Sequence, residues 1–348
     1  MNDIESLVRR NILQMSPYST ARDEFGGSLG VFLDANENPF PNGWNRYPDP
    51  RQKELKRVIS SIKGMPAESI FLGNGSDEAI DILFRVFCNP GEDNAVAIDP
   101  SYGMYTVAAQ INDVKMTLVP LGEGFSLPVE ALLDACDSRT RLMWLCSPNN
   151  PTGNAFAQED IVTLLGRFNG IVVVDEAYID FSGKPSLLPL ISKYRNLVVL
   201  QTFSKAYGLA ALRLGLAFAD PFVISIMSNV KYPYNINEAT QRLALEALTT
   251  KSVAGQVEII KNERAMLSEA LRAFPFVREV YPSDANFLLV RTDDADALYA
   301  HLVSDGIIVR NRTRVNLCAG CLRITVGTPE ENVLLLKSLE NYEKGDIR

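Results

Sequence analysis

Short, continuously apolar segments alternate with helical segments over residues 70 to 218, and this alternation limits the fold more than any other feature of the sequence. Segments typical of buried strands lie at 70–73, 95–98, 115–119, 141–146, 171–174, 197–200 and 214–218. Helical segments separate several of them, at 76–87, 105–111, 128–135 and 158–167. Strands that are apolar on both faces, joined through helices, predict a mostly parallel sheet in a three-layer α/β domain. The functional site of such a domain lies at the carboxyl ends of its strands.

The pattern changes near residue 236. A helical region from 238 to about 274, broken near 249–252, precedes strand and helix segments at 279–281, 287–290, 295–304, 307–309, 322–326 and 329–342. These elements predict a smaller α+β domain. We therefore expect three parts: an N-terminal arm over 1–30 that packs with the smaller domain, a large domain over 31–236, and a small domain over 237–348. The arm is expected to hold a helix over 4–15 and a turn at Gly26-Gly27.

Composition argues against several classes of function. The chain of 348 residues has a net charge of −8 and no dense basic patch, which speaks against nucleic-acid binding. No apolar run reaches the ~18 residues of a membrane span, and the acidic N-terminus lacks a signal-peptide pattern. We therefore expect a cytoplasmic protein.

The cysteine and histidine content argues against a metal site. The five cysteines are scattered and odd in number, and although Cys318 and Cys321 have redox or half-zinc spacing, no second pair accompanies them. With a single histidine, His301, a Ser-His-Asp hydrolase and a histidine-bound metal are both poorly supported. We expect no metal and no disulfide framework.

Lys205 follows the predicted strand 197–200 and lies among the small residues Ser204, Ala206 and Gly208. Desolvation favours a neutral amine, and a neutral amine can attack a carbonyl to form a Schiff base. The small neighbours leave room for a flat ring, and Arg213 is close enough in sequence to reach an anionic group on that ring. Taken alone, the pattern also fits a solvated surface lysine.

Other polar residues follow predicted strands. Asp175 ends strand 171–174, and a buried carboxylate there needs a cationic partner, either a salt-bridged side chain or a protonated ring nitrogen. Tyr178 could reach an oxygen on the same ring. Asn150, in a turn after strand 141–146, could donate a hydrogen bond to that oxygen. Tyr102 is a candidate to stack on the ring, or else a core aromatic.

The segment Gly73-Asn74-Gly75-Ser76-Asp77-Glu78 connects a predicted strand to a helix. Its amide groups and the hydroxyl of Ser76 suit a phosphate at the helix N-terminus. Glu78 occupies the position where a dinucleotide-binding loop has glycine, and no Gly-Lys-Ser/Thr triplet marks a P-loop. A phosphate monoester therefore fits better than NAD or ATP, although Asp77 and Glu78 are also common at helix starts.

Together these motifs resemble those of fold-type-I aminotransferases, which depend on pyridoxal phosphate (PLP). Thr202-Phe203-Ser204-Lys205-Ala206-Tyr207-Gly208 fits the PLP-lysine signature, and 148–153 and 175–178 precede it in the family's order. The resemblance extends over nearly the whole chain. Within the family it is greatest to the members that transaminate L-histidinol phosphate, on the evidence of 33–39, 46–48, 75–78, 102–105 and 321–328.

The resemblance implies specific roles. Lys205 would hold PLP covalently and then move a proton between the substrate α-carbon and the cofactor. The residues implied to contact PLP are Ser76, Asp77, Glu78, Tyr102, Asn150, Asp175, Tyr178, Thr202, Ser204, Lys205 and Arg213, with Tyr47 reaching the site of a partner subunit. The residues implied to contact substrate are Tyr18, Asn36, Asn150, Arg310 and Arg323. A homodimer is therefore implied, with glutamate and 2-oxoglutarate as the second substrate pair.

Substrate choice rests on arginine, whose guanidinium binds both phosphate and carboxylate. Arg323 and Arg310 match the family's anion-binding arginines, but Arg310 lies close to Arg312 and Arg314, and any of these three could be solvated. Two other activities share most of the motifs: aromatic aminotransfer and decarboxylation of threonine phosphate. A PLP-binding regulator without turnover fits less well, because the chain has no room for an added DNA-binding segment.

Overall fold

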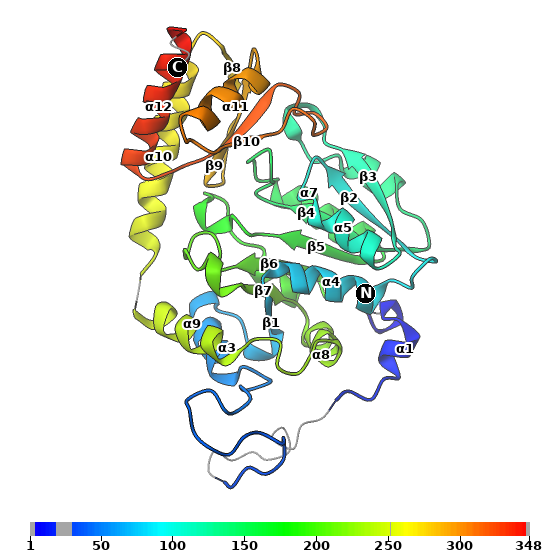
Figure 1. Cartoon of the computed structure of the whole chain (residues 1–348). Coiled ribbons are helices and arrows are strands. Elements are labelled where there is room, and N and C mark those ends of the chain that lie inside the picture. Colours follow the sequence, from blue (N-terminus) through cyan, green and yellow to red (C-terminus); the bar gives the residue numbers. More distant parts are fainter. Residues whose placement is uncertain (1–3, 19–29, 251, 346–348) are drawn as a thin grey trace.

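The computed structural model describes residues 4–18, 30–250 and 252–345, and it contains two sheets (Figure 1). The larger sheet has seven strands in the order β1-β7-β6-β5-β4-β2-β3. Its strands are β1 (Ile70–Asn74), β2 (Asn94–Asp99), β3 (Lys115–Pro120), β4 (Thr140–Cys146), β5 (Ile171–Asp175), β6 (Leu197–Thr202) and β7 (Leu214–Phe218). Only β7 runs antiparallel to its neighbours, β1 and β6. The mostly parallel sheet predicted from the sequence is therefore confirmed.

Helices cover both faces of this sheet. One face packs against α4 (Ser76–Phe87), α5 (Met104–Ile111) and α8 (Pro221–Val230), and the other against α3 (Lys53–Lys63), α6 (Val129–Asp134) and α7 (Gln158–Arg167). Strand β5 shows how the two cores are built: Ile171 and Val173 enter one, whereas Val172 and Val174 enter the other. Successive side chains of a strand point to opposite faces, so a continuously apolar strand requires this three-layer arrangement.

The second sheet has four antiparallel strands in the order β10-β11-β9-β8. These are β8 (Val277–Val280), β9 (Phe287–Thr292), β10 (Arg310–Asn311) and β11 (Cys321–Thr325). Helices α10 (Ala254–Arg272), α11 (Ala295–Ser304) and α12 (Pro329–Glu343) enclose its core. The smaller α+β unit is thus confirmed, although the last short strand before the arginine-rich loop begins at Arg310 and not at the expected 307–309.

Helix α9 (Glu238–Thr250) lies with the large sheet rather than with the small one. It packs against α3, and its Ala244 is buried in the same core cluster as residues of the large sheet. Figure 1 shows α9 and α3 together, whereas α10 lies with the smaller unit. The expected boundary at 236/237 therefore falls one helix too early, because sequence periodicity does not tell which body a helix packs against.

The described part of the N-terminal arm also packs against the large domain, which corrects the expectation that it packs with the small one. A 3₁₀ helix (Ile4–Leu7) and the short α1 (Arg10–Leu13) replace the single helix expected there. Ile4, Leu7 and Val8 are buried with residues of α4 and α8. The apolar side chains of the arm are therefore part of the core on that face of the large sheet. The predicted turn at Gly26-Gly27 lies outside the described residues.

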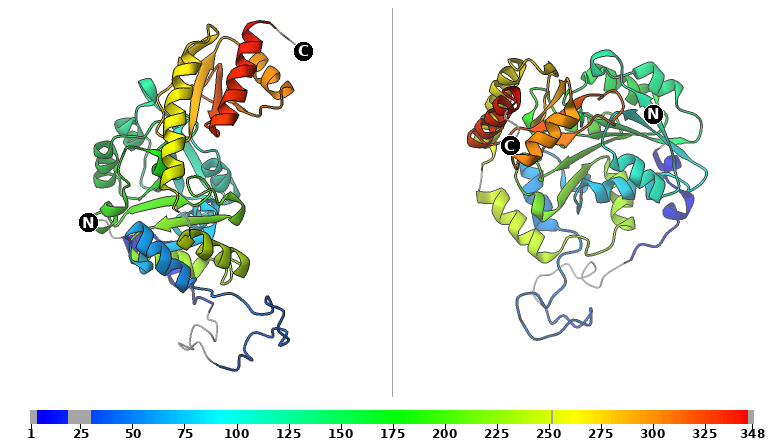
Figure 2. Two further views of the ribbon diagram at one scale, coloured as in Figure 1. Left: turned by 90° about the vertical axis from the view of Figure 1, so that its left-hand side faces the viewer. Right: turned by 45° about the horizontal axis from the view of Figure 1, so that its top comes forward.

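Residues 30–50 extend away from the rest of the chain (Figures 1 and 2). Val31, Leu33 and Phe40 in this segment are each more than three-quarters exposed, at 87%, 85% and 77%. None of the helices in the described part of the chain combines the length and the apolar character needed to span a lipid bilayer.

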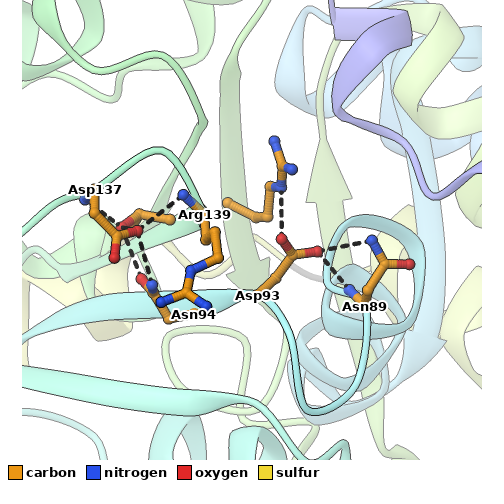
Figure 3. Close-up of polar contacts among 7 residues, drawn as sticks. Asn89, Asp93, Asn94, Asp137 and Arg139 are labelled. Atoms are coloured by element: carbon orange, nitrogen blue, oxygen red, sulfur yellow. Dashed lines mark hydrogen bonds and ion pairs between the residues drawn. The ribbon is translucent and has the colours of Figure 1, made fainter.

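Polar side chains form hydrogen bonds with one another at the amino-terminal ends of β2 and β4 (Figure 3). The buried carboxylate of Asp93 accepts hydrogen bonds from Asn89 and from the guanidinium of Arg141, the latter at 3.1 Å. Asp137 accepts from the side chain of Asn94 at 2.9 Å, and this bond is the main cause of its lowered pKa. Each of these two carboxylates therefore has hydrogen-bond partners within the protein, as buried or ordered polar groups usually do.

Candidate active site

A pocket of about 710 Å³ lies at the carboxyl ends of β4, β5 and β6, beside the N-terminus of α4 and beneath the β10–β11 pair. Twelve of the residues expected from the sequence line it: Ser76, Asp77, Tyr102, Asn150, Asp175, Tyr178, Thr202, Ser204, Lys205, Arg213, Arg310 and Arg323. These residues are widely separated in sequence. They meet because parallel strands end at the same edge of the sheet.

Asp175, the last residue of β5, is buried and has only neutral hydrogen-bond donors. The hydroxyl of Tyr105 donates to its Oδ2 at 2.8 Å, and the backbone N–H of Ala177 donates to its Oδ1 at 3.0 Å. Burial raises the pKa of Asp175 to about 6, although both hydrogen bonds oppose the rise. No ion pair reaches it from the part of the chain that the structure describes. A buried carboxylate of this kind fits a cationic ring nitrogen of a ligand.

Lys205 lies in the loop after β6 and faces the pocket. Its side chain keeps solvent-accessible surface because the pocket is open, so it is less buried than the sequence suggested. The surrounding protein nevertheless desolvates the amine and lowers its pKa, and the positive charge of Arg323 lowers it further. The Nζ atom lies 5.6 Å from the ring centroid of Tyr178. A lowered pKa increases the neutral fraction of the amine, the form that attacks a carbonyl, and the amine lies beside Tyr178.

A phosphate-sized cradle lies at the N-terminus of α4. Gly75 has a φ of +72°, and its N–H donates to the carbonyl oxygen of Arg213 at 2.6 Å. A Cβ added to Gly75 would lie 2.6 Å from a guanidinium nitrogen of Arg213, and one added to Gly215 would lie 2.0 Å from the amide nitrogen of Ser76. Both glycines therefore let the helix N-terminus and Arg213 approach one site, where amide groups and a cation favour an anion. Arg213 meanwhile forms a 3.5 Å ion pair with Asp77.

Hydroxyl groups border the same cradle. The hydroxyl of Thr202 lies 3.0 Å from that of Ser204, and the backbone N–H of Ser204 donates to the Thr202 hydroxyl at 3.1 Å. Together with Ser76 they provide donors that can turn toward phosphate oxygens. An aromatic aldehyde that carries both a ring nitrogen and a phosphate, as PLP does, fits the donors at this end and the buried carboxylate of Asp175.

Side chains that could orient a flat ring lie between these groups. The amide nitrogen of Asn150 donates to the hydroxyl of Tyr178 at 3.4 Å, and its Oδ1 accepts from Arg323 at 2.5 Å. Tyr102 donates from its hydroxyl to Asp77 at 3.0 Å. Its ring meets that of Tyr105 edge-on, with centroids 5.6 Å apart, and Tyr102 lines the pocket.

Sequence reasoning missed two residues of the site. Tyr105 contacts Asp175 from α5, but an aromatic residue on a helix is indistinguishable in sequence from a core residue, and Tyr105 does stack on Trp144 within the core. Arg312 lines the pocket together with Arg310 and Arg323. Its signal was present, since residues two apart on a strand share a face, but the strand was expected to end at 309.

Four of the expected residues lie outside the pocket. Glu78 accepts a hydrogen bond from the backbone of Asn74 at 2.5 Å and two from Asn235, so its side chain stabilises the turn before α4. Tyr18 borders a smaller pocket beside α8. Asn36 and Tyr47 line a third pocket next to the exposed segment, where Tyr47 stacks on Tyr234 at 4.4 Å between centroids.

Comparison with known proteins identifies the family to which the chain belongs. A sequence model of the family described as "Aminotransferase class I and II" matches residues 34–339. The chain is 54% identical to the histidinol-phosphate aminotransferase of Parabacteroides distasonis, over 99% of this chain and 100% of that protein. It is 50% identical to the protein of the same name from Cytophaga hutchinsonii, over 97% and 99% of the two chains.

Solved structures show the same fold at low sequence identity. A histidinol-phosphate aminotransferase from Clostridium acetobutylicum superimposes with a TM-score of 0.80 at 24% identity, covering 86% of this chain and 91% of that one. One from Sinorhizobium meliloti, in complex with pyridoxal-5'-phosphate, gives a TM-score of 0.79 at 22% identity and covers 97% of this chain and 98% of that one.

Proposed function

Because the chain belongs to the family of class I and II aminotransferases, we propose that it transfers an amino group from L-histidinol phosphate to 2-oxoglutarate. The products are imidazole acetol phosphate and L-glutamate, and the reaction belongs to L-histidine biosynthesis. The observation that carries this proposal is the identity of about half of all residues, over nearly the full length, to relatives named histidinol-phosphate aminotransferase. The pocket adds support, because it has a cationic group at each end.

The cofactor of the proposed reaction is PLP, which supplies when bound an aldehyde that receives the amino group and a ring that withdraws electrons. Lys205 would hold the cofactor covalently through its Nζ, and the same atom, once released from the cofactor, would accept and return the proton of the substrate α-carbon. Asp175 would pair with the ring nitrogen and favour its protonated form, because its buried carboxylate has no other cationic partner among the described residues. Asn150 and Tyr178 would bind the ring oxygen, and Tyr102 would pack on the ring face.

The two cationic ends of the pocket bind different anions, the cofactor phosphate at one end and the substrate phosphate or carboxylate at the other. Arg213, Ser76, Thr202 and Ser204 border the cradle at the N-terminus of α4 and hold the cofactor phosphate. Arg323 and Arg310 lie at the other end, on β11 and β10, and bind the phosphate of histidinol phosphate or a carboxylate of glutamate. One site can serve both substrates in turn because a guanidinium pairs with either anion.

We also propose that the enzyme is a homodimer, in which Tyr47 reaches the partner's site and Tyr18 and Asn36 contact substrate. The exposed apolar residues of segment 30–50 support this, since Val31, Leu33 and Phe40 are far more exposed than is usual for such residues. Sedimentation at micromolar concentration should give about twice the mass of the chain. A monomeric but active enzyme would contradict the dimer. The cytoplasmic location stays a prediction.

A half-reaction tests the proposed function directly. L-histidinol phosphate added to the PLP-loaded enzyme, without an acceptor, should convert the cofactor to its amino form, as seen in its absorption spectrum. Addition of 2-oxoglutarate should reverse the change. Lys205→Ala serves as the control and should show neither change. Rapid conversion by phenylalanine but not by histidinol phosphate would favour an aromatic aminotransferase, and release of CO₂ from threonine phosphate would favour the decarboxylase.

A further inference from the structure

Three arginines share one face of the β10–β11 pair. Arg310 stands directly opposite Arg323 in the register of the two strands. Arg312 follows Arg310 by two residues, and its backbone N–H continues the ladder by donating to the carbonyl oxygen of Cys321 at 2.8 Å. Side chains two residues apart on an extended chain point to the same side. All three guanidinium groups accordingly line the pocket.

This group of cations lacks a balancing acid within the described part of the chain. Like charges directly opposite each other on paired strands destabilise a sheet. Partial burial lowers the pKa of Arg312, and the charges of Arg323 and Arg310 lower it further. The acids that line the pocket are engaged elsewhere, since Asp77 pairs with Arg213 and Asp175 with the hydroxyl of Tyr105.

The hydrogen-bond donors of Arg312 are also incompletely used. Its Nε atom is buried and has no hydrogen-bond partner. Arg312 is half-buried, whereas Arg310 and Arg314 on either side of it are exposed. A guanidinium held partly out of water, with an unused donor and two neighbouring cations, is stabilised when an anion binds beside it.

We propose that Arg312 is a specificity-determining residue that contacts the substrate phosphate together with Arg310 and Arg323. The inference rests on the proposed function, because it places the phosphate of histidinol phosphate at this end of the pocket. A phosphate monoester carries a charge between about −1.5 and −2 at neutral pH and offers three acceptor oxygens. A carboxylate of glutamate carries one charge and two oxygens. Arg312 therefore adds more to the binding of the phosphorylated amine than to that of glutamate.

The test compares Arg312→Gln with Arg314→Gln in the PLP-loaded enzyme. Each variant is titrated separately with L-histidinol phosphate and with L-glutamate, and the half-reaction gives an apparent dissociation constant for each. Arg312→Gln should weaken histidinol phosphate roughly 10- to 100-fold, the usual effect of losing a hydrogen bond between charged groups. It should weaken glutamate less than about threefold. Arg314→Gln should change neither, because Arg314 does not line the pocket.

Two results would overturn the inference. An unchanged affinity for histidinol phosphate would show that Arg312 does not contact it, and an equal loss for both donors would show that Arg312 only shapes the pocket. If Arg312→Gln does not fold, Arg312→Lys is used. Lysine keeps the positive charge but lacks the paired N–H donors of the guanidinium. This variant should still lose more affinity for histidinol phosphate than for glutamate. The unmodified enzyme is assayed first, so its failure with histidinol phosphate would refute the proposed function separately.

Discussion

Replacing Asp175 by asparagine should change the stability of the cofactor-free protein in a pH-dependent way. The free energy of unfolding of the variant, minus that of the wild type, should be greater at neutral pH than at acid pH. Burial raises the pKa of Asp175 from its ordinary value of 3.8 to about 6, so the folded chain binds this proton more tightly than the unfolded chain. The stability of the wild type should therefore fall as the pH rises between these two values. Asparagine has the same shape and does not titrate.

The size of the effect follows from the two pKa values. A shift of about two units corresponds to roughly 3 kcal/mol over the whole window, and about 1 kcal/mol of it lies between pH 5 and pH 7.5. A comparison of the variant with the wild type at a single pH is insufficient, because the side-chain NH2 of asparagine faces a donor, either the Tyr105 hydroxyl or the Ala177 N–H, and one hydrogen bond is lost. That loss is the same at both pH values. It cancels when the stability difference at pH 5 is subtracted from the difference at pH 7.5.

The assay is urea unfolding of the cofactor-free proteins at pH 5 and pH 7.5, at one protein concentration. The stability of Asp175→Asn minus that of wild type should be greater at pH 7.5 by about 1 kcal/mol. Asp137→Asn is the matched control: hydrogen bonding from Asn94 lowers the pKa of Asp137, so its stabilising effect is lost only as the pH falls below its ordinary 3.8. It should show no trend between pH 5 and 7.5. A trend for Asp175→Asn that is absent or reversed would refute the view that an uncompensated charge is buried there.

Three further substitutions probe the site. Gly215→Ala should destabilise the protein by roughly 3 kcal/mol or more in thermal or urea unfolding, because its Cβ would lie 2.0 Å from the amide nitrogen of Ser76. Its control is Gly166→Ala on α7, which has open space at its Cβ and should be neutral or slightly stabilising. Arg213→Gln should weaken cofactor binding about tenfold, measured as PLP released on dialysis; unchanged retention would remove Arg213 from the phosphate site. Lys205→Ala should leave PLP bound non-covalently and prevent reduction by borohydride from attaching it to the chain, and a labelled peptide from another part of the sequence would contradict the assignment of Lys205.

Much of the site was predictable because local sequence fixes the ends of the strands. The apolar runs of β4, β5 and β6 can only be buried strands, and the residues that follow them must then gather at one edge of the sheet. Asp175 and Lys205 were found in this way, as polar residues directly after such strands. The glycine-rich connection before α4 likewise indicated an anion site from local chemistry alone.

The remaining features depend on contacts between residues far apart in the chain, which periodicity does not encode. An aromatic residue on α5 has the same pattern whether it fills the core or donates to a carboxylate, and only the position of α5 in the folded chain gives Tyr105 its bond to Asp175. Likewise, the sequence of the arginine-rich segment is compatible with solvated side chains, and only the pairing of β10 with β11 places Arg310 opposite Arg323 and brings Arg312 to the pocket. The sequence by itself determined the layers of the large domain, the strands of its sheet and the position of Lys205 after one of them, because those follow from local burial. The tertiary structure alone decided which distant side chains meet there, because that depends on how the layers pack.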